Sequence, residues 1–268
     1  MLKGLLKTII LKLPFGRPLA DAIKRQLPSY KTSIPYWIKK YIHNAEVNVV
    51  QIGAFDGATE DHLFDLIRRN NQWNVLFVEP VPESFKALKQ NYGNASRFSF
   101  ENAGINKTGE SQPFYKISDK AFVDIDDLSI SYRQISSFSL AHVKALSKDV
   151  IPENYIHSID INCLSLNDLF KKHKIDALDL FVIDAEGYDW EIVSQLDLNL
   201  YQPKVIIFEA VNLNQDELSE AKNNLGKLYF IFKMGINYVC FKKDIITPKD
   251  YKRLNNLKAI RFANDYSE

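Results

Sequence analysis

The sequence predicts an α/β fold built on a mostly parallel sheet with helices on both of its faces. Short runs of β-branched and aromatic residues occur at 49–52, 74–78, 97–103, 178–183 and 205–209, and helical patterns separate them. Strands that alternate with helices pair in parallel through crossover connections. The chain has 268 residues, 46% of them hydrophobic, which is enough to bury the core of one large domain.

Residues 1–45 are predicted to form a helical accessory region ahead of the sheet, with four prolines as breaks. Within it, leucines and isoleucines from Leu2 to Leu13 recur at helical spacing, while Lys3 and Lys7 lie off that stripe. The commoner role of such an amphipathic helix is to dock on its own domain or on a second subunit. The alternative is peripheral contact with an anionic membrane surface.

The composition excludes several classes of protein. Lys and Arg number 34 against 33 Asp and Glu, so the net charge of +1 gives no reason to expect a nucleic-acid partner. Cys163 and Cys240 show no metal-binding spacing, which is typical of a reducing compartment. No apolar run approaches the roughly 18 to 20 residues that span a bilayer. We therefore expect a cytoplasmic protein, peripheral to the inner face of a membrane if its first helix binds lipid.

The first predicted strand runs directly into the segment Gly53-Ala54-Phe55-Asp56-Gly57, and a helical pattern begins at Thr59. The second predicted strand ends at Glu79. Ligands of open α/β sheets bind outside the carboxyl ends of the strands, and an acid about 20 to 30 residues beyond a glycine loop can accept hydrogen bonds from two ribose hydroxyls. This unit predicts an adenosine cofactor.

The charge of the loop selects among adenosine cofactors. A dinucleotide needs Gly-x-Gly-x-x-Gly, and the spacing here is Gly53-x-x-x-Gly57. Asp56, Glu60 and Asp61 would repel a pyrophosphate, whereas S-adenosylmethionine carries a sulfonium and an ammonium. The loop therefore favours S-adenosylmethionine. The alternative for these acids is structural, with Asp56 capping the turn and the other two complementing a helix dipole.

The rest of the chain supplies an insertion and a closing hairpin. Asn102 and Ala103 end the third strand, where their backbone groups could meet an adenine. Residues from about 105 to 158 break the alternation and are predicted to bind the substrate and to form a lid. The main domain is expected over 46–243, closed by an antiparallel pair at 227–232 and 237–241, and residues 244–268 form a tail.

Three buried strands of the predicted sheet end in carboxylates, at Glu79, Asp184 and Glu209. A single acid after a strand is usually a solvated loop residue. Three on one rim of a parallel sheet converge on one crevice, which solvation explains poorly. Asp184 and Glu209 are expected beside the methyl donor.

Several segments together resemble those of the FkbM-type methyltransferases, over about 47–242. They are 51–57 (QIGAFDG), 77–80 (FVEP), 180–189 (LFVIDAEGYD), 207–209 (IFE) and 136–138 (SSF) with His142. The resemblance implies a Rossmann-like class I methyltransferase with a mostly parallel seven-stranded sheet, which moves a methyl group from S-adenosylmethionine to a hydroxyl of a sugar or another secondary metabolite.

Carried over by position, the resemblance assigns Gly53, Asp56, Glu79 and Asp184 to the cofactor. Gln51 departs from the family, which often has an acid there, and this departure concerns the methionine end of the cofactor. The full set of predicted cofactor residues is Gln51, Gly53, Ala54, Phe55, Asp56, Gly57, Glu79, Asn102, Ala103 and Asp184.

The predicted catalytic residues are His142, Asp184 and Glu209. An alcohol is a poor nucleophile at neutral pH, so a base or a cation must assist. In one interpretation His142 accepts the hydroxyl proton; in the other, Asp184 and Glu209 bind Mg²⁺ or another divalent cation. The structural alternatives are a packing or surface histidine, and carboxylates that bind the donor's amino group or cap a helix.

Two other functions compete with a methyltransferase for a hydroxylated small molecule or glycan. A nucleotide-dependent oxidoreductase with a degenerate fingerprint is disfavoured by the acidic loop. A non-catalytic cofactor-binding module is disfavoured because all three strand-end acids are present, although a fold alone never guarantees activity.

Overall fold

The computed structural model describes residues 33–42, 46–209 and 211–264, with side chains as far as residue 256. The predicted amphipathic helix at the N-terminus lies outside these ranges. No helix in the described residues is both long enough and apolar enough to cross a membrane.

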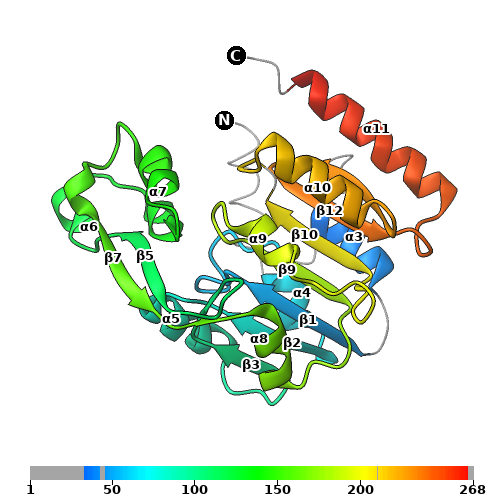
Figure 1. The fold of residues 1–268 in the computed structure, drawn as a ribbon, viewed down its shortest axis with the longest axis horizontal. Coiled ribbons are helices and arrows are strands. Elements are labelled where there is room, and N and C mark those ends of the chain that lie inside the picture. The colour runs from blue at the N-terminus through cyan, green and yellow to red at the C-terminus, as the bar shows by residue number, and fades with distance from the viewer. Residues whose placement is uncertain (1–32, 43–45, 210, 265–268) are drawn as a thin grey trace, which may run out of the picture.

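A seven-stranded sheet forms the centre of the molecule (Figure 1), in the order β3-β2-β1-β9-β10-β12-β11. Its strands are β1 (Val47–Ile52), β2 (Trp73–Val78), β3 (Phe98–Glu101), β9 (Leu180–Ile183), β10 (Val205–Glu209), β11 (Tyr229–Met234) and β12 (Asn237–Lys242). All neighbours are parallel except β12, which is antiparallel to β10 and to β11. The predicted Rossmann-like class with seven mostly parallel strands is confirmed.

Helices cover both faces of the sheet because its central strands are apolar on both sides. In β1, Val47 and Val49 belong to one buried cluster, and Val50 and Ile52 belong to another. The first cluster is covered by α3 (Ile34–Tyr41), α4 (Phe64–Arg69), α5 (Pro82–Tyr92) and α11 (Pro248–Asn264). The second is covered by α8 (Leu166–His173), α9 (Asp189–Val193) and α10 (Gln215–Leu225).

The two ends of the described chain meet on the first of these faces. Trp37 of α3 is fully buried there. Asp250 of α11 accepts hydrogen bonds from Lys40 and, at 2.6 Å, from Tyr41 Oη. The end of the predicted accessory region and the predicted tail thus both pack on the sheet domain.

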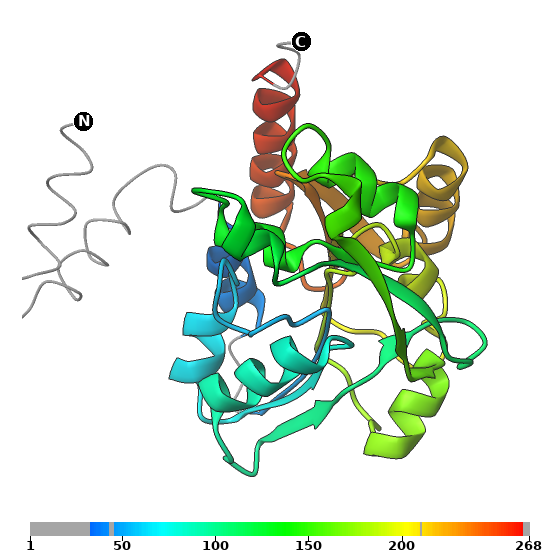
Figure 2. The ribbon, with the colours of Figure 1, turned by 90° about the vertical axis from the view of Figure 1, so that its left-hand side faces the viewer.

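The insertion forms a lobe beside the sheet, drawn in green in Figures 1 and 2. Its small antiparallel sheet pairs β5 (Gln112–Ile117) with β6 (Ser136–Ser137) and β7 (Ile156–Ile161). The lobe also contains α6 (Ala121–Asp124), η2 (Ile130–Gln134), α7 (Leu140–Ser147) and η3 (Glu153–Tyr155), and β4 (Gly104–Ile105) pairs with β8 (Cys163–Leu164) at its base. The insertion therefore extends to residue 161, the end of β7, whereas the sequence places its boundary at about 158.

The helix after the glycine loop begins later than the sequence pattern predicts, at Phe64 instead of Thr59. Asp56 and Asp61 accept hydrogen bonds from the backbone N–H groups of residues 58, 59 and 63. Glu60 has a left-handed φ of 58°. Side-chain acceptors that compete for backbone donors favour turns over helix. The result is an irregular segment above β1 that carries Asp61 toward the sheet.

Candidate active site

A cavity of about 940 Å³ opens at the carboxyl ends of β1, β2, β9 and β10, where the strand order reverses between β1 and β9. Ile34 of α3 and Gln134, Ser136 and Phe138 of the insertion also line it. No Lys or Arg of the described residues is among the lining side chains. The carboxylates that line it are Glu60, Asp61, Glu79, Asp184, Glu186 and Glu209.

The glycine loop lies tightly over the sheet edge. The backbone N–H groups of Gly53 and Ala54 both donate to the carbonyl of Val78, at 3.0 and 3.1 Å. Gly53 has a φ of +75°, and a Cβ there would lie 1.7 Å from the carbonyl oxygen of Asp184. Only glycine allows the loop to approach β9 so closely. Gly53, Ala54 and Phe55, three of the predicted cofactor residues, line the cavity.

Glu79, the acid predicted to bind the ribose hydroxyls, is held in the cavity wall by the glycine loop. Its Oε2 accepts from the N–H of Phe55 at 2.8 Å, and its Oε1 accepts from the N–H of Val81 at 2.9 Å. Only 4% of Glu79 is exposed, and burial raises the pKa of this carboxyl to about 7 against the opposing effect of the two N–H groups. The carboxylate is therefore fixed in position at the tip of β2.

Two of the predicted loop residues lie away from the cavity. Asp56 accepts hydrogen bonds from the N–H groups of Ala58 and Thr59 at 2.9 and 2.7 Å and from Thr59 Oγ1 at 2.6 Å. Gly57 faces α5, where an added Cβ would meet the side chains of Leu88 and Tyr92. Asp56 thus has the turn-capping position that the sequence left open as an alternative.

The end of β3 is joined to the end of β2. Asn102 Nδ2 donates to the carbonyl oxygens of Glu79 and Pro80, at 2.7 and 3.1 Å. Ala103 lines the cavity, whereas Asn102 does not. Of this predicted pair, one residue lies in the cavity wall and the other holds two strand ends together.

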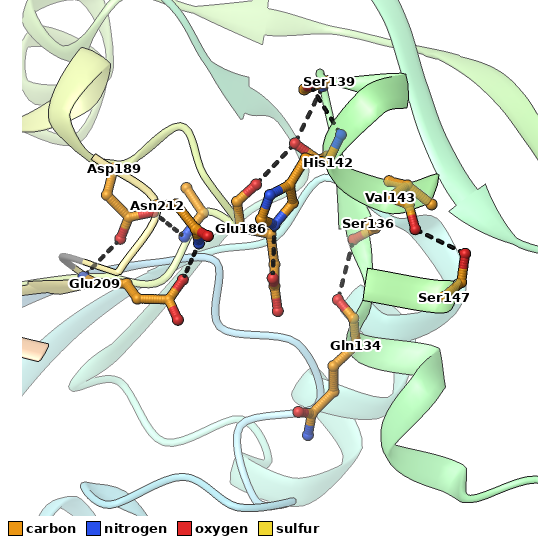
Figure 3. Close-up of polar contacts among 12 residues, drawn as sticks. Gln134, Ser136, Ser139, His142, Val143, Ser147, Glu186, Asp189, Glu209 and Asn212 are labelled. Carbon is orange, nitrogen blue, oxygen red and sulfur yellow. Dashed lines mark hydrogen bonds and ion pairs between the residues drawn. The ribbon is translucent and has the colours of Figure 1, made fainter. Parts of the chain in front are cut away.

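Asp184 and Glu209 follow adjacent parallel strands, since Ile183 of β9 pairs with Phe208 of β10. Burial and the nearby charges of Glu186 and Glu209 raise the pKa of Asp184 to about 7. Asp189 connects the two strand ends: its Oδ1 accepts from the N–H of Glu209 at 2.9 Å, and its Oδ2 accepts from the N–H of Ala185 at 3.3 Å (Figure 3). The structure therefore brings the predicted pair together.

His142 approaches these acids from the insertion. It lies in the first turn of α7, where its N–H donates to Oγ of the N-cap residue Ser139 at 3.2 Å. Its Nε2 is 3.3 Å from Oε2 of Glu186 (Figure 3), and Ser137 Oγ donates to the carbonyl oxygen of Glu186 at 2.8 Å. Glu186 lines the cavity, whereas His142 does not. The histidine thus stands behind a carboxylate that faces the cavity.

Glu186 is not among the site residues predicted from the sequence. The residue belongs to the segment 184–187 (DAEG) that carries much of the resemblance, but 44 residues separate it from His142. The backbone φ of Glu186 is +48°, a left-handed value that few non-glycine residues adopt and that clusters at functional sites. Only the packing of the insertion on this loop reveals the pair.

A model of the Methyltransferase FkbM domain matches residues 51–229, most of the chain. The chain belongs to the FkbM methyltransferase family. Together with the sheet topology, this membership identifies an S-adenosylmethionine-dependent methyltransferase, so the oxidoreductase alternative is wrong. A comparison with curated proteins found no match.

Solved structures of other methyltransferases are similar to this chain at low identity. Methyltransferase FkbM from Methylobacillus flagellatus KT is 15% identical with a TM-score of 0.44, covering 74% of this chain and 44% of its own. Human methyltransferase-like protein 13, solved in complex with SAH, is 9% identical with a TM-score of 0.38, covering 80% and 81%. A TehB-like SAM-dependent methyltransferase from Corynebacterium glutamicum is 12% identical with a TM-score of 0.34, covering 86% and 100%.

The cavity has the chemistry that S-adenosylmethionine requires. Carboxylates surround a space suited to a sulfonium and an ammonium, and the bare backbone at Gly53 leaves room for close approach. Gln51 in the wall has a buried Oε1 without a hydrogen-bond partner in the described residues. In that same part of the chain, no cluster of three or more His, Cys, Asp or Glu could hold a metal ion; the predicted cation site comprises Asp184 and Glu209 alone.

Proposed function

We propose that this methyltransferase acts on a hydroxyl group of a sugar, a glycan or another hydroxylated small molecule. The observation that carries the proposal is the His142–Glu186 pair beside the acidic cavity. A carboxylate backed by an imidazole is an arrangement that can accept a proton from an alcohol. The pair lies where the insertion meets the carboxyl ends of β9 and β10.

The glycine loop and two acids would hold the cofactor. Backbone groups of Gly53 and Phe55 and the carboxylate of Glu79 would bind its adenosine end, and Asp184 would face its positive charge. When bound, S-adenosylmethionine supplies an electrophilic methyl group. These residues are prearranged, because Glu79 and the loop are already joined by hydrogen bonds.

The chain's own residues would then position the acceptor, exclude water and take up one proton. The acceptor oxygen would form its bond to the methyl carbon as the carbon–sulfur bond of the cofactor breaks, and the hydroxyl proton would leave that oxygen. We assign this proton to Oε2 of Glu186, with Nε2 of His142 as the second member of the pair. Alignment of the reacting atoms accounts for much of the barrier lowering in such displacements.

The alternative means of activation is a divalent cation between Asp184 and Glu209. Such a cation would lower the pKa of the acceptor hydroxyl. Asn212 Nδ2 already donates to Oε2 of Glu209 at 2.7 Å, which orients that carboxylate toward its neighbours. Removal of cations by a chelator separates this alternative from the histidine pair.

The charge of the cavity limits the acceptor. Its lining contains several carboxylates and, in the described residues, no Lys or Arg. The carboxylates of the cavity would repel a phosphate or carboxylate on the acceptor, whereas they would not repel a neutral polyol or an amine. We therefore propose an uncharged or positively charged acceptor. The cytoplasmic location and the partners of the N-terminal helix stay predictions from the sequence.

The test is transfer of a labelled methyl group from S-adenosylmethionine to small molecules in a cell extract, followed by mass spectrometry of the product. We expect label in a hydroxylated compound without phosphate. Label in protein or nucleic acid would contradict the proposal, and a complete lack of transfer would favour the non-catalytic module. Turnover that survives a chelator removes the cation.

Two variants address the proton acceptor. His142→Gln and Glu186→Gln are expected to lower turnover by about 100-fold or more, which is the usual contribution of a positioned acid or base, and to leave S-adenosylhomocysteine binding nearly unchanged. His157→Gln is the matched control, because His157 is an exposed histidine of the same insertion. Normal turnover in both test variants would contradict the assignment.

A further inference from the structure

Gln51 and Asp61 form a hydrogen-bonded pair in the cavity wall. Gln51 precedes the last residue of β1, and only 6% of it is exposed. Its Nε2 donates to Oδ2 of Asp61 at 3.1 Å. Oδ1 of Asp61 accepts from the N–H of Leu63 at 2.6 Å. Both side chains line the cavity.

This pair lacks two interactions that buried polar groups ordinarily have. Gln51 Oε1 is buried and has no donor in the described residues. Asp61 is half-buried and forms no ion pair with a Lys, Arg or His of the described residues; burial raises the pKa of its carboxyl against the opposing effects of two hydrogen bonds and of the nearby His62. An unsatisfied buried acceptor costs free energy, and a half-buried carboxylate without an ion pair is stabilised by a positively charged partner. A ligand group with a positive charge and more than one N–H donor would satisfy both at once.

The local backbone explains how an acid reaches this place. The segment between the glycine loop and α4 is irregular, with Asp56 and Asp61 capping its turns. That geometry places Asp61 over the end of β1, ten residues along the chain from Gln51. The carboxylate that β1 itself lacks is thus supplied by the next segment of the chain.

We propose that Gln51 Oε1 and the Asp61 carboxylate together bind the ammonium group at the methionine end of the cofactor. This inference rests on the proposed function. A primary ammonium offers three N–H donors and one positive charge, so it matches both unsatisfied features. A ribose hydroxyl would supply a donor to Gln51 but no charge to Asp61. Asp61 therefore supplies the charge, and Gln51 orients it.

The experiment compares two stable ligands by isothermal titration calorimetry. S-adenosylhomocysteine has the amino-acid end, and 5′-methylthioadenosine has the same nucleoside and sulfur without it. Asp61→Asn is expected to weaken S-adenosylhomocysteine by about 10- to 100-fold, the loss of one charge-assisted hydrogen bond, and to change 5′-methylthioadenosine less than about twofold. Equal weakening of both ligands, or of neither, would overturn the inference.

A double variant moves the acid back to the strand. Gln51→Glu/Asp61→Asn preserves the net charge and an amide–carboxylate pair, so it is expected to restore the wild-type ratio of the two affinities. If Asp61→Asn does not fold, the double variant decides alone. Equal affinities of the double variant for S-adenosylhomocysteine and 5′-methylthioadenosine would overturn the inference. The control is Asp65→Asn, an exposed carboxylate on α4, which should leave both affinities unchanged.

A failure of the proposed function can be distinguished from a failure of the ammonium site alone. If the wild-type protein binds neither ligand, the proposed function fails together with the inference. If it binds both and Asp61→Asn does so equally well, only the ammonium site fails. Melting temperatures of all variants confirm that each protein is folded.

Discussion

The two halves of the cavity rim are built in different ways. In the half at β1 and β2, the carboxylates of Asp61 and Glu79 accept hydrogen bonds from backbone N–H groups of the chain close by. In the half at β9 and β10, Asp184, Glu186 and Glu209 face one another, and a histidine from the insertion stands beside them.

This difference separates a rigid cofactor half from an acceptor half that depends on long-range packing. Hydrogen bonds within a turn form as soon as the turn does, whereas the β9–β10 half requires the insertion to be in place. Asp189, which is 1% exposed, accepts hydrogen bonds from backbone N–H groups at both strand ends and so fixes where these acids lie. Burial and the charges of Asp184 and Glu209 raise the pKa of its own carboxyl. The acceptor half is therefore where we expect substitutions to affect chemistry more than folding.

The largest effect is expected from Asp184→Ala, at the boundary between the two halves. Asp184 lies against the glycine loop and beside the other acids, so its loss should reduce turnover by about 100-fold or more, as removal of a central charged contact does. Labelled methyl transfer measures the loss of turnover, and calorimetry with S-adenosylhomocysteine measures the loss of cofactor affinity separately. Full activity would show that Asp184 has no part in the site.

Glu79 distinguishes a structural from a ligand-binding contribution within the cofactor half. Glu79→Ala leaves the N–H groups of Phe55 and Val81 without their acceptor, at a cost of about 1 to 3 kcal/mol each in unfolding free energy. Glu79→Gln retains one acceptor oxygen and should lose less stability, while both variants bind S-adenosylhomocysteine more weakly. Urea unfolding measures the first quantity and calorimetry the second. Equal stability of the two variants would contradict this account.

The pH dependence of stability tests the buried acids of both halves together. Glu79 and Asp184 have pKa values raised to about 7 in the folded protein, so between pH 4 and 7 the folded state holds protons that the unfolded chain has released. Stability should fall as pH rises through this range, by about 1.4 kcal/mol per pH unit for each group, and level off above it.

Urea unfolding of the ligand-free protein from pH 5 to 8 measures this slope, and Glu79→Gln should flatten it. S-adenosylmethionine carries a net positive charge that favours the charged carboxylates, so it should stabilise the protein more at pH 8 than at pH 6. Stability that rises from pH 5 to 7 would contradict the raised pKa values.

The smallest effect is expected from Asp56→Ala, although Asp56 lies in the segment 51–57, which carries part of the resemblance to the family. Loss of the turn cap should cost about 0.5 to 2 kcal/mol of unfolding free energy. S-adenosylhomocysteine affinity should change little, because Asp56 does not line the cavity. A loss of affinity as large as that of Glu79→Gln would place Asp56 among the ligand-binding residues.

The central strands β1, β2, β9 and β10 were predictable because each is a short apolar run in which both faces are buried, and such runs are specified locally. The irregular turn at 57–63 was not, since a helical pattern continues through it and only the competing acceptors Asp56 and Asp61 interrupt the helix. The predicted boundary of the insertion at about 158 falls inside β7, because the pairing of β7 with β5 leaves no signal in either segment alone.

The sequence by itself determined the sheet, the glycine loop and the carboxylates at three strand ends, because apolar patterning and chain order dictate which residues follow which strand. Only the tertiary structure decided which of those acids face the cavity, that Asp61 stands beside Gln51, and that Glu186 meets His142. These contacts join side chains from different elements, and their free energy depends on packing and burial that no single segment encodes.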